Sequence, residues 1–165
     1  MGKNLHIVVF SLGKELYGLG IDSVHEIVRV PDITSLPDSP VFLEGVINLR
    51  GKIISVIDLR KRFRLEGTAE ITAAKILVIE NEGNKIGILV DSVAEVLKIQ
   101  PDAVEKPPEI VSAIGIDYIK GVIKVEEKLI IILEIKKILS VEEMKKLGNN
   151  IKMENKPDGP KMEAR

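Results

Sequence analysis

Few residues in this chain have the types and spacing that catalysis requires. The two histidines are His6, at the start of an apolar segment, and His25, two residues after Ser23. A serine and a histidine so close in sequence rarely converge as nucleophile and base, and there is no Gly-x-Ser-x-Gly elbow. The chain has no cysteine, and no group of side chains has the spacing of metal ligands. The sequence therefore predicts a protein that is not an enzyme and uses no metal or cofactor.

Three other patterns have a structural explanation beside a functional one. Gly18-Leu19-Gly20 lacks the third glycine of a dinucleotide site and fits a strand that needs close backbone approach. Asp58 follows an apolar segment, as a phosphate-accepting aspartate would, but without a neighbouring acidic pair it is better explained as a cap before Leu59. The basic segment Arg60, Lys61, Arg62 and Arg64 resembles a nucleic-acid contact, although a net charge of −1 gives no general attraction to nucleic acid.

Two segments share one pattern but differ at the tip. "GVINLRGKIISVIDL" (45–59) and "GVIKVEEKLIIILEI" (121–135) each predict a hairpin of two apolar strands. The first tip is Asn48-Leu49-Arg50-Gly51, and the second is Lys124-Val125-Glu126-Glu127. Gly51 fits a turn position with positive φ. For the arginine and leucine beside it we expect exposure, and such a pair is typical of an interface.

These hairpins belong to a tandem duplication of the whole chain. Residues 6–30 align with 75–99, and residues 42–63 align with 118–139, in the same order. Each copy predicts five short strands with no room for crossover helices, which favours a small barrel because closure removes exposed edges. We therefore expect an all-β fold of two packed five-stranded barrels with short helices.

The predicted domain spans residues 1–148. It divides into one subdomain of about 4–68, a second of about 69–139, and a short helix at 140–147, where Ser140 and Glu143 have capping-box spacing. The polar segment 149–165 predicts a disordered tail. Ser23-x-x-Glu26 and Ser92-x-x-Glu95 also have capping-box spacing, which gives Glu26 a structural explanation at a helix start.

Composition predicts a cytoplasmic protein that does not insert into membranes. The longest apolar run, Leu129 to Leu133, is far too short for a membrane span. The first ten residues lack the apolar core and cleavage site of a signal peptide. The absence of cysteine fits a reducing compartment.

The motifs "EGVINLRGKIISVIDLRKRF" (44–63), "VHEIV" (24–28) and "VDSVAEVL" (90–97) resemble the CheW family of chemotaxis adaptors. The resemblance covers roughly residues 4–147, including the duplication. It implies two SH3-like barrels and a non-catalytic scaffold that couples chemoreceptors to the histidine kinase CheA. The implied location is the cytoplasmic side of membrane chemoreceptor arrays. The implied partners are the receptor cytoplasmic tip and the regulatory domain of CheA.

The same resemblance implies a set of receptor-binding residues. Arg50 in the Asn-Leu-Arg-Gly tip matches the arginine linked to receptor coupling, and Val93 would form the opposite wall of a groove between the barrels. The full set is Val24, Glu26, Ile27, Asn48, Leu49, Arg50, Gly51 and Val93. Two alternatives stay open at this point: an SH3-like nucleic-acid-binding protein, and a detached regulatory domain of a CheA-type kinase.

Overall fold

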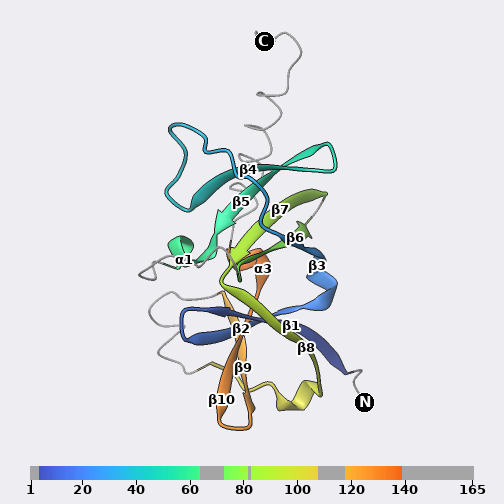
Figure 1. The fold of residues 1–165 in the computed structure, drawn as a ribbon. Coiled ribbons are helices and arrows are strands. Elements are labelled where there is room, and N and C mark those ends of the chain that lie inside the picture. The colour runs from blue at the N-terminus through green and yellow to red at the C-terminus, as the bar shows by residue number, and fades with distance from the viewer. Residues whose placement is uncertain (1–3, 64–72, 82, 108–117, 139–165) are drawn as a thin grey trace, which may run out of the picture.

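Two β-sheets stacked one above the other make up the fold in the computed structural model (Figure 1). The structure describes residues 4–63, 73–81, 83–107 and 118–138. The strands are β1 (Leu5–Leu12), β2 (Glu15–Gly20), β3 (Val24–Arg29), β4 (Leu43–Leu49), β5 (Lys52–Asp58), β6 (Lys75–Asn81), β7 (Asn84–Val90), β8 (Ser92–Ile99), β9 (Ile119–Val125) and β10 (Lys128–Leu133). The short helices are η1 (Ile21–Ser23), α1 (Leu59–Arg62), η2 (Pro101–Ala103) and α3 (Ile135–Ile138).

Each sheet contains five strands, as the duplication predicts, but the two copies exchange strands. Sheet A has the order β8-β1-β2-β10-β9, and sheet B has the order β3-β6-β7-β5-β4. Each sheet thus joins the first two strands of one copy to the last three of the other. The joins include one parallel pair per sheet, β10 with β2 and β5 with β7. The predicted subdomain boundaries, 4–68 and 69–139, therefore do not coincide with the sheets, because local sequence patterns do not specify which copy supplies the partner strand.

Three apolar clusters hold the described strands and helices together. The largest lies between the sheets and includes Phe10 and Leu19 from sheet A with Ile57 and Ile88 from sheet B. A second cluster packs against sheet A on residues such as Ile130, and a third packs against sheet B. Strands such as β5 are therefore apolar on both faces, since one face meets the other sheet and one meets the sheet's own core.

A backbone bridge links the two edge strands of each sheet. The segment after β3 pairs with β4 through Thr34 and Val46, with N···O distances of 2.9 and 2.8 Å. In sheet A, Glu105 pairs in the same way with Val122 of β9, at 2.8 Å in both directions. The segment after one edge strand thus crosses to the opposite edge, as in a barrel.

This crossing leaves no room for a side chain at Gly45. A Cβ there would lie 2.2 Å from the Thr34 carbonyl oxygen, and the residue has φ of +152°. We expect Gly45→Ala to destabilise the fold by roughly 2 to 4 kcal/mol through overpacking and backbone strain. Urea unfolding followed by circular dichroism measures the change. The matched control is Gly20→Ala, where an added Cβ meets nothing within 4 Å; equal stability of the two variants would contradict the steric explanation.

Two expectations about helices have different outcomes. The prediction of helix starts at Ser23 and Ser92 is wrong, because Glu26 and Glu95 lie within strands β3 and β8. Pairing with β6 and β1 outweighs the local capping signal. The predicted helix at 140–147 and the tail at 149–165 lie outside the described residues. Within the described part of the chain, no helix is long and apolar enough to cross a membrane.

Candidate functional site

The β4–β5 tip is a tight turn held by its own residues. Gly51 has φ of +86°, which confirms the prediction, and Arg50 also adopts a positive φ, of +51°. The side-chain oxygen of Asn48 accepts a hydrogen bond from the Gly51 N–H at 2.8 Å. Asparagine side chains commonly stabilise turns by accepting such a hydrogen bond from a nearby backbone N–H. The Asn48 side chain is also exposed to solvent. The turn presents the Arg50 side chain from a fixed backbone.

The structure brings Arg50 together with Glu26, which the sequence placed in a separate motif. The Arg50 guanidinium donates a hydrogen bond to the Glu26 carboxylate. Glu26 lies on β3, the edge strand opposite β4 in sheet B, so the ion pair joins the two edges near the end of the sheet. The Arg50 side chain remains 67% exposed, whereas that of Glu26 is 25% exposed. The arginine is therefore both oriented and accessible to a partner.

The ion pair affects the protonation of both groups. The hydrogen bond from Arg50 lowers the pKa of Glu26 below its ordinary value, and the charges of Arg50, His25 and Lys85 lower it further. The same hydrogen bond raises the pKa of Arg50. Near neutral pH both groups are therefore charged, and the tip presents a cation whose orientation is set by a neighbouring carboxylate.

Two other predicted residues differ in exposure. Leu49 is half-buried and packs against the apolar cluster of sheet B, so the expectation of an exposed leucine beside Arg50 is wrong. The end of the hairpin contacts the apolar cluster of its own sheet, so Leu49 is not fully exposed. Ile27 is 40% exposed and alternates with the half-buried Glu26 along β3. Its apolar surface is available for contact.

Val24 and Val93 lie where the two sheets meet. Val24 is the first residue of β3, and Val93 is the second residue of β8. Both are half-buried and pack against the apolar cluster between the sheets. Strand β3 therefore runs from this junction, at Val24, to the ion pair at Glu26. The predicted residues therefore form two groups connected by β3. The junction group contains Val24 and Val93, and the tip group contains Glu26 and Arg50.

The sister tip, between β9 and β10, is also a two-residue turn that begins with a positive φ, but it carries the opposite charge. Glu126 has φ of +59°, matching Arg50 in the first hairpin. Lys124 pairs with Glu105 at 3.7 Å, and both side chains are largely exposed. An equivalent turn position with reversed charge makes Glu126 the control position for Arg50.

Three cations of the basic segment are engaged within the protein. Arg60 forms a bidentate pair with Asp91, with distances of 2.8 and 2.6 Å. Lys61 pairs with Glu44 at 3.2 Å. Arg62 donates to the Ile138 carbonyl at 2.9 Å and lies over the Phe42 ring. The fourth, Arg64, lies outside the described residues. These contacts give the segment a structural role.

The segment also shows that Asp58 is a helix cap. Its carboxylate accepts hydrogen bonds from the backbone N–H groups of Arg60 and Lys61 at 2.9 and 3.4 Å. Burial raises the pKa of Asp58, and these bonds offset part of that effect. The predicted capping role is confirmed.

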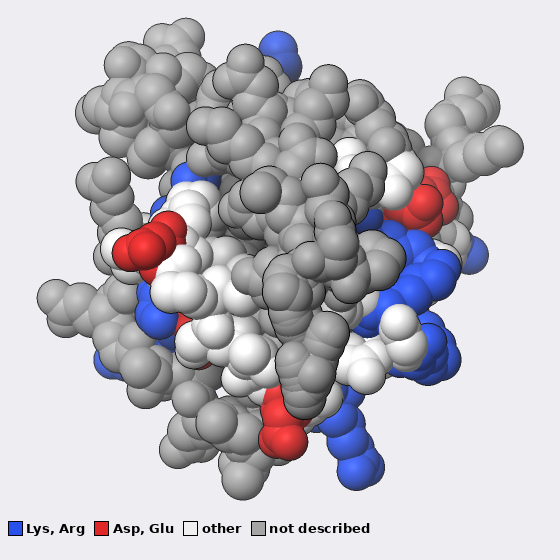
Figure 2. Space-filling model, turned by 90° about the horizontal axis from the view of Figure 1, so that it is seen from above, with Lys and Arg blue, Asp and Glu red and all other residues white. Residues whose placement is uncertain are grey.

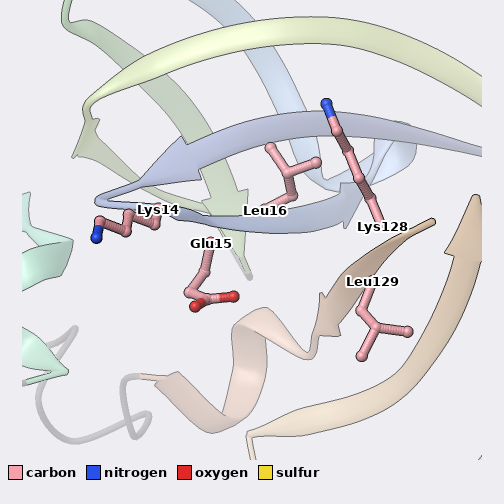
Figure 3. Close-up of a pocket in the computed structure, with 5 residues that line it drawn as sticks. All are labelled: Lys14, Glu15, Leu16, Lys128 and Leu129. Atoms are coloured by element: carbon pink, nitrogen blue, oxygen red, sulfur yellow. The ribbon is translucent and has the colours of Figure 1, made fainter.

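A shallow pocket lies on sheet A, away from the predicted site. It is lined by Lys14, Glu15, Leu16, Lys128 and Leu129, at the β1–β2 turn and the start of β10 (Figure 3). None of these residues belongs to the predicted set. Among the described residues, no group of three or more His, Cys, Asp or Glu side chains could hold a metal ion.

Charges of both signs occur on the face seen from above the molecule. Lys and Arg side chains gather at the right-hand side of this view, with an acidic patch directly beside them (Figure 2). Further acidic side chains appear at the left and lower edges. On this face, the described residues therefore show charges of both signs rather than a continuous basic surface of the kind that attracts nucleic acid.

Comparison with known proteins shows the family of this chain. The CheW-like domain family matches residues 6–143. A chemotaxis protein CheW of Treponema pallidum is 38% identical over 151 residues, covering 89% of each chain. One of Klebsiella aerogenes is 34% identical over 142 residues, covering 86% of each. The crystal structure of the scaffolding protein TtCheW from Thermoanaerobacter tengcongensis superimposes with a TM-score of 0.77 and 43% identity, covering 87% of this chain and 92% of that one. The chain belongs to the CheW-like domain family.

Proposed function

We propose that this protein is a non-catalytic chemotaxis adaptor that couples chemoreceptors to a CheA-type histidine kinase. The observation that carries the proposal is the Arg50–Glu26 pair at the β4–β5 tip, connected by β3 to Val24 at the sheet junction. Its relatives bear the names chemotaxis protein and scaffolding protein, which supports the assignment. The proposed location is the cytoplasmic side of receptor arrays.

The receptor-binding surface in this proposal has two parts. The junction supplies apolar contact from Val24, Ile27 and Val93, which suits the apolar face of a partner helix. The tip supplies an exposed arginine, a residue type enriched at the centres of interfaces. Three further residues fix the position from which the arginine projects. Asn48 and Gly51 stabilise the turn by their hydrogen bond, and Leu49 packs against the apolar cluster of sheet B. Kinase binding is assigned to another face of the same protein.

A binding assay with both partners tests the proposal. The full chain is immobilised and exposed separately to a chemoreceptor cytoplasmic fragment and to CheA. We expect each to be retained, and both to be retained together when they are mixed. Failure to retain the receptor fragment, or failure to retain CheA, would overturn the proposed function, because an adaptor must bind both.

The structure favours neither of the two alternative functions that the sequence leaves open. A nucleic-acid-binding protein would use the basic segment, but Arg60, Lys61 and Arg62 are engaged by Asp91, Glu44, Ile138 and Phe42. A detached kinase regulatory domain would share the fold, whereas the relatives that match along most of their length are CheW proteins. We expect no retardation of labelled RNA or DNA at physiological salt; binding with a steep salt dependence would support the nucleic-acid function instead.

A further inference from the structure

One residue connects the two sheets where β7 passes into β8. Strand β7 ends at Val90 in sheet B, and β8 begins at Ser92 in sheet A. Asp91 alone lies between them. The first copy makes the corresponding passage, from β2 to β3, through the three residues of η1. The second passage is therefore the shorter one, and Val93 of the predicted groove follows it two residues later.

Side-chain and backbone bonds at Asp91 join both sheets. Its carboxylate accepts the bidentate pair from Arg60, which lies in α1 directly after β5 of sheet B. The same carboxylate accepts a hydrogen bond at 2.7 Å from the N–H of Gly13, in the β1–β2 turn of sheet A. The Asp91 N–H donates to the Ser11 carbonyl at 3.0 Å. We call Ser11, Gly13, Arg60 and Asp91 the Asp91 cluster.

The cluster is well shielded from solvent. The side chains of Arg60 and Asp91 are 12% and 16% exposed. Burial alone raises the pKa of Asp91, but the hydrogen bonds from Arg60 and Gly13 and the charge of Arg60 hold it below its ordinary value. The carboxylate is therefore ionised near neutral pH and can accept all of these bonds. A planar guanidinium in a two-point contact fixes orientation as well as distance.

The equivalent position in the first copy lacks such a cluster. Asp22 aligns with Asp91 in the duplication, but it lies exposed in η1. Within the described part of the chain its side chain makes no hydrogen bond or ion pair. One passage between the sheets is thus held by a carboxylate and the other is not. The difference is not required by the repeated scaffold, which points to a role specific to the β7–β8 passage.

We propose that Arg60 and Asp91 are positioning residues that fix the angle between the two sheets and thereby hold Val93 in place for receptor binding. This inference rests on the proposed function, because it assigns Val93 to the receptor groove. Neither residue touches the partner. Their effect passes through a one-residue connection, so a change of angle moves the start of β8 relative to β3.

The geometric part can be measured without any partner. The chain has no cysteine, so two introduced cysteines can be spin-labelled specifically. Arg29 on β3 and Lys98 on β8 are equivalent residues of the two copies; both are exposed, and they lie in different sheets. The label sites are therefore Arg29→Cys and Lys98→Cys. Pulsed electron paramagnetic resonance of the full chain should give one narrow distance distribution. Asp91→Asn in this background should broaden or shift it, whereas the control Asp22→Asn should leave it unchanged.

The binding part uses the same substitutions without the labels. We expect Asp91→Asn to weaken binding of a chemoreceptor cytoplasmic fragment by at least about 5-fold, the lower end of typical coupling between sites. Arg60→Lys keeps the charge but loses the bidentate contact, so it should show a smaller effect of the same kind in both measurements. This second variant decides the question if Asp91→Asn does not fold.

The outcomes separate this inference from the proposed function. An unchanged distance distribution in folded Asp91→Asn and Arg60→Lys overturns the inference. A changed distribution with unchanged receptor affinity also overturns it, because the angle would then not control the groove. Failure of the unsubstituted protein to bind the fragment overturns the proposed function instead, and with it the assignment of Val93, while the distance measurement still reports whether the Asp91 cluster sets the angle.

Discussion

The Arg50→Glu variant is expected to lose receptor-dependent kinase activation by well over 10-fold while it melts almost as the unsubstituted protein does. The Arg50 side chain is 67% exposed and contacts Glu26. Substitutions at such surface positions usually change stability little, so we expect a change in melting temperature of less than about 2 °C. An arginine at the centre of an interface commonly contributes more than the equivalent of a tenfold change in affinity. Charge reversal also adds repulsion against any acidic group or carbonyl of the partner that the guanidinium contacts.

The measurement is a reconstituted kinase assay with receptor, CheA and each variant, alongside melting curves. Glu126→Arg is the matched control, because Glu126 occupies the same turn position in the sister hairpin with φ of +59°. We expect this control to change activation much less. Full activation by a normally melting Arg50→Glu variant would show that the two tips are not functionally different.

A charge swap distinguishes a contact role for Arg50 from a purely structural one. The double variant Glu26→Arg with Arg50→Glu can restore the ion pair, but it reverses the charge at the exposed tip. We expect normal melting without recovery of kinase activation, because the partner would still meet a carboxylate where it requires a guanidinium. Recovery of full activation would mean that the pair acts only by bracing the edges of sheet B.

Features that depend on neighbouring residues could be predicted from the sequence. The hairpins 45–59 and 121–135 correspond to β4–β5 and β9–β10, because apolar runs around a tight turn specify antiparallel pairing locally. Gly51 has the expected positive φ, since a turn imposes it. Asp58 caps α1 as predicted, because the cap and its N–H donors lie within three residues. Two five-stranded units also follow from the duplication.

Features that depend on residues far apart in the sequence could not be predicted from it. The exchange of strands between copies leaves every local pattern unchanged, because β1 has the same apolar faces whichever strand pairs with it. The Arg50–Glu26 pair joins residues from opposite edges of sheet B, and their separate motifs contain no signal of contact. The Asp91 cluster is likewise not predicted by the sequence patterns. Its only signal was an aspartate at the same position in both copies, Asp22 and Asp91.

The exchange of strands places both connections between the sheets next to edge strands. Both passages between the sheets, at η1 and at Asp91, run directly into the edge strands β3 and β8. The two predicted groove walls, at Val24 and Val93, are therefore placed by the same connections that hold the sheets together. We therefore expect changes at these connections to affect both receptor binding and fold stability.

Residues 1–68 expressed alone are expected to be largely unfolded or aggregated. This fragment contains the hairpins β1–β2 and β4–β5, but it lacks β6 and β7, the neighbours of β3 and β5 in sheet B. It also lacks the three strands that complete sheet A. Isolated hairpins are marginally stable at best. A unit of about 65 residues also buries only about 60% of its unfolded surface, and the apolar faces of this fragment would have nothing to cover them.

The exchange of strands adds a second expectation, that the halves restore each other. Fragments 1–68 and 69–165, unfolded together and diluted from denaturant in equal amounts, should form a 1:1 complex with the circular dichroism spectrum and cooperative melting of the full chain. Each fragment diluted alone is the control and should show neither. Independent barrels would give the opposite result, with each fragment folding alone and no complex on mixing. A cooperatively melting monomer of 1–68 would therefore contradict the pairing of β3 with β6 and of β5 with β7, on which the architecture depends.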